Sequence, residues 1–182
     1  VEANVTAPIN KEALKLFFFN DAATTEIYAD KTGTRDYAMM LVHEGLHVIH
    51  VSTHVSLREA CDLVSRERVG KVVDLADQAL RHLGVTEPRI AVAGLNPHAG
   101  ENGMFGREEI EIQPALEEAR ARGINAIGPL PPDTLFPRAA GGEYDCVVVM
   151  YHDQGHIPLK LLGFRYDSGT GGFTDVKGVN VT

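Results

Sequence analysis

Apolar residues along this chain fall into short strand-like runs separated by longer stretches of helical period. The runs "YAMMLV" and "LHVIHVST" meet at Glu44 and Gly45, a pair that predicts a tight hairpin turn. Further along, "RIAVAGL" and "CVVVMYH" predict buried strands, and "INAIGPL" predicts a shorter one. The Gly-rich, polar text from 164 to 178 predicts an exposed loop or hairpin.

Helical periodicity marks the segments between these runs. We predict helical structure from Ser56 to Leu83 and again over "REEIEIQPALEEARARG", with a kink near Pro114 and an end at Gly123. In the first segment the recurring apolar positions are Val69, Val72, Val73, Ala76, Ala79, Leu80 and Leu83. A further short helix is predicted over "NKEALKL". Strands alternating with helices indicate an α/β fold with a mixed sheet covered on both faces.

Composition narrows the class of protein. The 182 residues, 44% of them hydrophobic, suit one globular domain or slightly more. A net charge of −8 argues against nucleic acid as the main partner, but it leaves room for a small anionic substrate held by local Lys and Arg. No apolar run approaches the roughly 18 residues of a membrane helix, and no signal peptide is visible, so we expect no membrane partner and a cytoplasmic location.

Two further features concern thiols and chain ends. Cys61 and Cys146 lie far apart in sequence, which predicts buried thiols rather than a disulfide framework. The chain has no initiator Met and stops at "GVNVT", inside a strand-like run. We therefore expect an internal fragment of a longer protein.

Candidate chemistry gathers where strands end. His54, His98 and His152 each follow an apolar run, and the crevice beyond the carboxyl ends of an open α/β sheet is where ligands bind. Three imidazoles delivered to one rim predict a divalent metal site with positions left for water or substrate. Asp153 adjoins one of these histidines, and Asp133 follows another strand.

Other readings of these residues stay open at this point. A single histidine at a strand end is usually structural, and His43, His47, His50 and His82 are expected to be surface or half-buried residues. The side chain of Lys160 either lies along an apolar surface with its ammonium group in water, or its ammonium group neutralises an anionic substrate. The common nucleotide loops and the nucleophile elbow are absent from the sequence, so composition and spacing do not name the reaction.

Several long motifs carry a resemblance. "GLNPHAGENG", "GPLPPDTLF", "MYHDQGHIPLKLLGF" and "GVNVT" resemble the 4-hydroxythreonine-4-phosphate dehydrogenase family of vitamin B6 biosynthesis, over nearly the whole chain. "THVSLR" and the segment 164–178 are closer to its branch that acts on D-threonate and D-erythronate 4-phosphate. The resemblance implies a three-layer α/β/α fold like isocitrate and isopropylmalate dehydrogenases, here incomplete at both ends. Residues 1–182 would form the central part of a pair of dehydrogenase subdomains.

The same resemblance implies a reaction and its cofactors. Family members oxidise a secondary hydroxyl with NAD or NADP and then decarboxylate the β-keto acid, using a divalent metal such as Zn, Mg, Mn or Co. They are homodimers, and histidines from both subunits share one active site. Carried over to this sequence, the metal ligands are His54, His98 and His152, and the substrate contacts include Lys160 and Asn180. Asp133 is either a support for one of these histidines or a helix cap.

One segment departs from the family pattern. The family's Gly-His-Thr-Glu is "ATTE" here, so Thr24 stands in place of a substrate-binding histidine while Thr25 is retained. The difference reflects an altered substrate site, a non-catalytic relative or a sequence error. A different class is also open, a metal-dependent hydrolase or phosphatase that uses the same three histidines with Asp153.

Overall fold

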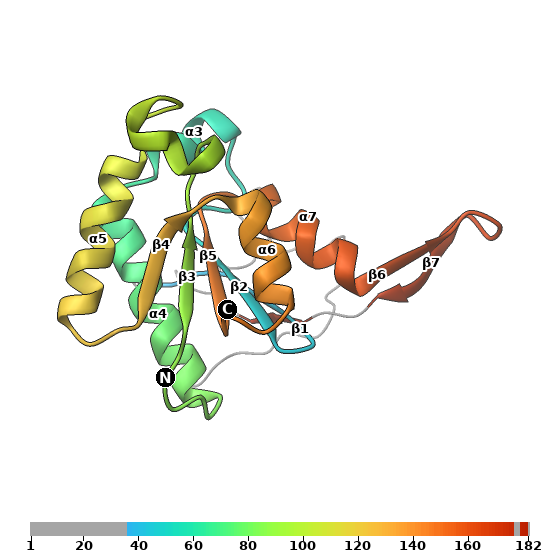
Figure 1. Ribbon diagram of the computed structural model, residues 1–182. Helices are drawn as coiled ribbons and strands as arrows, with labels where there is room; N and C mark the ends of the chain where they lie inside the picture. The colour runs from blue at the N-terminus through green and yellow to red at the C-terminus, as the bar shows by residue number, and fades with distance from the viewer. Residues whose placement is uncertain (1–35, 177–178, 182) are drawn as a thin grey trace, which may run out of the picture.

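The main body of the protein is a six-stranded mixed sheet. The computed structural model describes residues 36–176 and 179–181 (Figure 1). The main sheet has the order β4-β3-β5-β2-β1-β8, and β6 and β7 form a separate two-stranded sheet. The strands are β1 (Met40–His43), β2 (Leu46–His50), β3 (Ile90–Ala93), β4 (Ala126–Leu130), β5 (Cys146–Val149), β6 (Phe164–Asp167), β7 (Gly172–Val176) and β8 (Val179–Val181). The helices are α3 (Leu57–Asp62), α4 (Arg66–His82), α5 (Glu109–Ala121), α6 (Pro132–Ala140) and α7 (His152–Gly163).

Strand directions confirm the predicted mixed sheet. β4, β3, β5 and β2 run parallel, whereas β1 is antiparallel to both β2 and β8. The β1–β2 turn falls at Glu44 and Gly45, whose φ angles of 45° and 88° are those a type I′ hairpin requires. The predicted hairpin within 164–178 is also present as β6 and β7, which extend away from the body (Figure 1).

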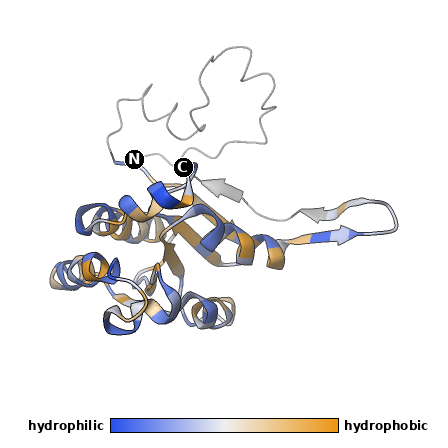
Figure 2. Cartoon of the chain, turned by 90° about the horizontal axis from the view of Figure 1, so that it is seen from above, coloured by the Kyte–Doolittle hydropathy of each residue, from blue (hydrophilic) through white to orange (hydrophobic). Residues whose placement is uncertain are grey.

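Helices cover both faces of the sheet, as the sequence pattern predicted (Figure 2). On one face α4 and α5 pack over strand residues such as Val148, and on the other face α6 and α7 pack over Val147 and Val149. This alternation follows the two-residue period of a strand. Both β3 and β5 are buried along their whole length, which is why their sequences are continuous apolar runs.

The α4 helix shows why the apolar period was informative. Most of the recurring positions are fully buried, and each Val or Leu among these stabilises the fold by roughly 1.5–3 kcal/mol if it was exposed in the unfolded chain. Ala79 is half-buried, and Leu83, the C-cap residue, is 62% exposed. The predicted single helical segment is in fact two helices. α3 ends at Asp62, and Ser65, in an extended conformation, accepts the N–H of Arg68 and caps α4.

Several sequence predictions need correction or lie elsewhere. β5 ends at Val149, so His152 is the first residue of α7 rather than the end of a strand. α7 was not predicted, because Pro158 and two glycines obscure its helical period. Cys146 is buried, and burial raises the pKa of its thiol, but Cys61 is only half-buried. "NKEALKL" lies outside the described residues. Within 36–176 and 179–181, no helix is both long and apolar enough to cross a membrane.

Candidate functional site

The segment that leads to His54 is fixed against the end of β5. After β2 the chain continues through Val51, whose N–H donates to Val149 O at 2.8 Å. Ser52 follows, and its buried hydroxyl donates to Met150 O at 2.8 Å. The chain approaching His54 is therefore held on the same strand whose extension carries His152.

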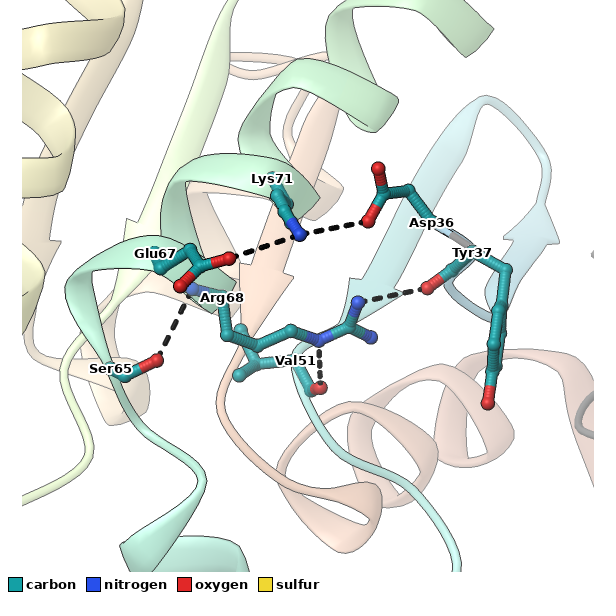
Figure 3. Close-up of polar contacts among 7 residues, drawn as sticks. All are labelled: Asp36, Tyr37, Val51, Ser65, Glu67, Arg68 and Lys71. Atoms are coloured by element: carbon teal, nitrogen blue, oxygen red, sulfur yellow. Dashed lines mark hydrogen bonds and ion pairs between the residues drawn. The ribbon is translucent and has the colours of Figure 1, made fainter. Parts of the chain in front are cut away.

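Arg68 of α4 adds a second anchor to this segment (Figure 3). Its Nε donates to Val51 O at 2.9 Å, and its Nη1 donates to Tyr37 O at 3.0 Å. Burial lowers the pKa of this guanidinium, because both acceptors are neutral carbonyls rather than carboxylates. Beside it, Lys71 bridges Asp36 and Glu67 on the surface. α4 thus connects the entry to β1 with the exit from β2.

His54 and His152 face one hollow. Their ring centroids are 5.5 Å apart with an interplanar angle of 48°. The hollow has a volume of about 300 Å³. Its lining residues are Thr53, His54, Val55, Leu57, Ala60, Tyr151, His152 and Asp153. The two predicted ligands thus come together at one site although 98 positions of sequence separate His54 from His152.

Asp153 orients the imidazole of His152. The Nδ1 of His152 lies 2.7 Å from Oδ1 of Asp153, and an ionised carboxylate only accepts. The proton of the ring is therefore on Nδ1, and Nε2 presents a lone pair. A carboxylate that holds one nitrogen of a histidine while the other binds metal is the usual arrangement around metal-ligating imidazoles.

Two more histidines pack behind His152. The ring of His156 stacks on it with centroids 3.6 Å apart and planes within 10°. On the other side of His156 lies His50, which is fully buried. The ring centroids of His50 and His156 are 4.8 Å apart. Burial is the main cause that lowers the pKa of both His50 and His156 to about 4, so both rings are neutral at pH 7.

The burial of His50 corrects a prediction. His43 and His50 were expected at the surface or half-buried, but both are buried, while His47 is half-buried and His82 exposed. His50 donates from Nδ1 to Met39 O at 3.1 Å, and among the described residues its Nε2 has no hydrogen-bond partner. The sequence did carry a signal for this cluster, because "HVSTH" and "HDQGH" both place two histidines four residues apart.

His98 stands on a loop of unusual conformation, Pro97–Gly103, here called the left-handed loop. Four of its non-glycine residues have φ between 42° and 56°, and they are His98, Ala99, Glu101 and Asn102. Each costs about 1–2 kcal/mol in this conformation, and such residues cluster at functional sites where their surroundings enforce them.

Glu109, the first residue of α5, holds the left-handed loop in place through hydrogen bonds with Asn96, the residue that precedes the loop. Its Oε1 accepts the backbone N–H of Asn96 at 2.8 Å, and its Oε2 accepts from the Asn96 side chain at 2.9 Å. Gly100 has a φ angle of 77°, and a Cβ there would lie 2.5 Å from the same carboxylate, so any other residue would strain the backbone and displace Glu109. The ring of His98 itself lies 5.8 Å from that of Phe105.

The other predicted site residues are placed as follows. Asp133 lies in the first turn of α6, and Oδ1 of Asp133 accepts the N–H of Thr134 at 3.0 Å. The N-cap of α6 is Pro131. Lys160 is exposed on α7, on the helix face that carries His152. Asn180 pairs with Leu41 through β8. Thr24 and Thr25 lie outside the described residues.

The residues present suit a divalent cation in part. Imidazole nitrogen binds Zn²⁺ at about 2.0–2.1 Å, so rings 5.5 Å apart are close enough to share one ion. Within the described part of the chain, no three His, Cys, Asp or Glu side chains are grouped to hold a metal. The donors His54 and His152 therefore fit two positions of such a site, and His98 as a third ligand remains a prediction.

Comparison with known proteins identifies the family. The family model described as the pyridoxal phosphate biosynthetic protein PdxA matches residues 1–182, the whole chain. The chain belongs to the PdxA family. A PdxA-family relative from Salmonella typhimurium, D-threonate 4-phosphate dehydrogenase, is 55% identical over 183 aligned positions, which cover all of this chain and 53% of the relative. The corresponding dehydrogenase from Pectobacterium atrosepticum is 54% identical over the same share.

Solved structures agree with this assignment. The 4-hydroxythreonine-4-phosphate dehydrogenase of Klebsiella pneumoniae is 55% identical with a TM-score of 0.78, over 86% of this chain and 49% of that protein. Its counterpart from Burkholderia phymatum is 41% identical with a TM-score of 0.76, over 96% of this chain and 51% of that one. The chain spans about half the length of the PdxA-family relatives it matches.

Proposed function

We propose that the full-length protein is a metal-dependent, NAD- or NADP-linked dehydrogenase that oxidises and decarboxylates D-threonate 4-phosphate. The observation that carries the proposal is the pair of imidazoles, His54 and His152, on the wall of one hollow. It is supported by 55% identity to a relative named for this activity. Residues 1–182 would form the central part of its two subdomains.

The chemistry assigns a separate task to each residue. His54, His98 and His152 would hold a divalent cation, which when bound supplies Lewis-acid polarisation of the substrate hydroxyl. Asp153 keeps the proton of His152 on Nδ1, so that Nε2 stays a ligand. Lys160, exposed on the His152 face of α7, would bind anionic oxygen of the substrate. Thr24, Thr25, Asn180 and Asp133 complete the proposed contacts, the last as a support.

The reaction balances in two steps. First, the carbon that bears the hydroxyl transfers hydride to the oxidised nicotinamide, and the hydroxyl proton leaves, which gives a β-keto acid and the reduced cofactor. The bond to the carboxylate then breaks, releasing carbon dioxide, and its electron pair forms an enolate that takes up a proton. Positive charge near the keto oxygen stabilises that enolate in a site screened from water.

An assay of the full-length protein tests the proposal. With a divalent metal, NAD or NADP and D-threonate 4-phosphate, we expect reduced cofactor and carbon dioxide in equal amounts. Chelation should stop the reaction, and added metal should restore it. 4-Hydroxythreonine 4-phosphate distinguishes the vitamin B6 branch of the family, and D-erythronate 4-phosphate is the other substrate of the D-threonate branch. Phosphate release without any nicotinamide would instead favour a hydrolase. No product from any of the phospho-acids would favour a non-catalytic relative.

We also propose a homodimer with a shared site. Support comes from exposed apolar side chains that follow one another on α7 and the β6–β7 hairpin: Ile157, Leu161, Leu162, Tyr166 and Phe173. A second copy could bring the third ligand that the described residues do not place beside His54. Mixing His98→Ala and His152→Ala subunits should then restore about a quarter of the parent activity, because half the dimers carry one intact site. Two inactive parents that stay inactive after exchange would contradict a shared site.

A further inference from the structure

The first turn of α7 carries a stacked pair of histidines. His152 and His156 are four residues apart, so their side chains leave the same face of the helix. Their rings are nearly parallel, with centroids 3.6 Å apart, and His156 is only 7% exposed whereas the side chain of His152 is 32% exposed. The outer ring of the pair therefore lies on a buried inner ring.

The inner ring has little freedom to move. Nδ1 of His156 lies 3.0 Å from the carbonyl oxygen of His152, and because a carbonyl only accepts, that nitrogen carries the proton. On its other side His156 contacts His50, which is itself tied by Nδ1 to Met39 O. Gly155 permits this packing, since a Cβ there would lie 2.6 Å from Nε2 of His50.

The outer ring depends on this support. His152 is the first residue of α7 and faces the hollow, and the other contact of its ring within the helix is to Asp153, which is 66% exposed. An exposed carboxylate restrains a ring weakly, because water competes for it. A flat, buried surface against one face of the ring removes most of its remaining rotational freedom.

We propose that His156 is a positioning residue, which fixes the imidazole of His152 in the orientation that presents its Nε2 to the hollow. This inference rests on the proposed role of His152 as a metal ligand. His156 reaches the site only through the ring of His152, and its hydrogen bond and stack act on the same residue. Removing its ring would return His152 to several orientations and weaken its binding to an ion without removing any ligand.

The chain offers a matched control for the hydrogen bond alone. His82 on α4 makes the same contact, from its Nδ1 to the carbonyl oxygen of Gln78 four residues earlier, at 2.7 Å. It is exposed, it belongs to no stack of rings, and it is remote in the fold from the hollow. An effect that came only from this type of helix contact would be the same for His82→Ala and His156→Ala.

The test uses the full-length protein and Co²⁺ as the probe, followed by its visible absorption. We expect His156→Ala to bind Co²⁺ at least ~10-fold more weakly than the parent, His156→Phe, which keeps a flat ring, to bind close to the parent, and His82→Ala to be unchanged. The Co²⁺ spectrum of His156→Ala should also broaden. Equal affinity in His156→Ala and the parent would overturn the proposal.

A second readout needs no metal. Long-range proton–nitrogen NMR spectra of the metal-free protein report which ring nitrogen is protonated. We expect the parent to show His152 and His156 each protonated on Nδ1, and His156→Ala to show His152 as a mixture of both forms. An unchanged His152 would contradict positioning. If the parent binds no Co²⁺, or if His152→Ala binds it equally well, the proposed metal site fails instead, and the NMR result still decides the positioning role.

Discussion

The ends of β5 and β3 carry two of the predicted ligands, and they are built in different ways. Beyond β5, His152 begins a regular helix and lies on a stack of buried rings that extends to His50. Beyond β3, His98 is one of four non-glycine residues in left-handed conformation, and hydrogen bonds from Asn96 to Glu109 hold this loop in place. His152 is oriented by burial and packing. His98 is oriented by the hydrogen bonds between Asn96 and Glu109, here called the polar clamp, which hold the strained backbone of the loop.

This difference indicates which changes should disturb the surroundings of His152 and which should disturb the loop of His98. Packing of neutral buried rings is sensitive to protonation and to added volume. A polar clamp is sensitive to loss of one acceptor, and its failure should be local because none of residues 97–103 belongs to the buried apolar clusters. The changes below act on one side at a time.

The largest effect is expected from acid. His50 has a pKa lowered from 6.5 to about 4 by burial, so above pH 6.5 it is neutral in both folded and unfolded chains. Between pH 6.5 and about 4 the unfolded state takes up the proton first, and the free energy of unfolding falls by up to ~3 kcal/mol as pH falls through this window. Urea titrations with a chelator present, at pH 7 and pH 4.5, measure this loss.

Matched variants assign the acid effect to the ring. His50→Leu should be less stable at neutral pH but should lose less stability on acidification, while exposed His82→Gln should behave as the parent does. His156 adjoins His50 and has the same lowered pKa, so part of the slope persists in His50→Leu. An unchanged slope in that variant would show that His50 is not a source of the acid sensitivity.

A smaller effect is expected from one added methyl group on the same side. In Gly155→Ala the new Cβ would meet His50, Val48 and Val149 at 2.6–2.9 Å, all within the core, and should cost about 2 kcal/mol of stability by overpacking. Gly70→Ala in α4 is the control, because nothing lies within 4 Å of its Cβ. Alanine there should stabilise the helix by about 0.5–1 kcal/mol. Thermal melts that move both variants in the same direction would contradict this packing.

The left-handed loop should respond differently. Glu109→Ala removes the acceptor of the Asn96 backbone N–H and one of the two acceptors of its side chain, while Glu108 Oε2 still accepts from that side chain at 2.6 Å. The change should cost about 1 kcal/mol of global stability but should weaken binding of Co²⁺ about tenfold, because the loop relaxes and His98 moves. Glu117→Ala on the exposed side of α5 is the control. A Glu109→Ala protein with parent affinity for Co²⁺ would show either that the loop holds its shape alone or that His98 is not a ligand.

The sequence predicted the framework well because its signals are local. The alternation of strands with helices, the turn at Glu44 and Gly45, and the buried face of α4 follow from residue periods that the packing obeys. The site was predicted less completely. The proximity of His54 and His152 follows from β2 and β5 being neighbours in the sheet, which the sequence alone does not determine.

The misses have physical causes as well. His50 is buried because a parallel neighbour and α7 cover its strand, and the run "LHVIHVST" that contains it does not show which elements cover that strand. The clamp between Asn96 and Glu109 joins residues 13 apart across a loop whose positive φ angles have no signature in His98 or Ala99. Long-range contacts of this kind depend on the finished fold rather than on local preference.

The central claim is that His54, His98 and His152 bind one divalent cation in the full-length protein. Equilibrium binding of Co²⁺ to the parent and to each single His→Ala variant tests it most directly. The account predicts one ion per subunit in the parent and a large loss of affinity in all three variants, with His82→Ala unchanged. Parent-like binding by His98→Ala, together with loss in the other two, would show that the ion is held without the left-handed loop and would contradict the three-histidine site.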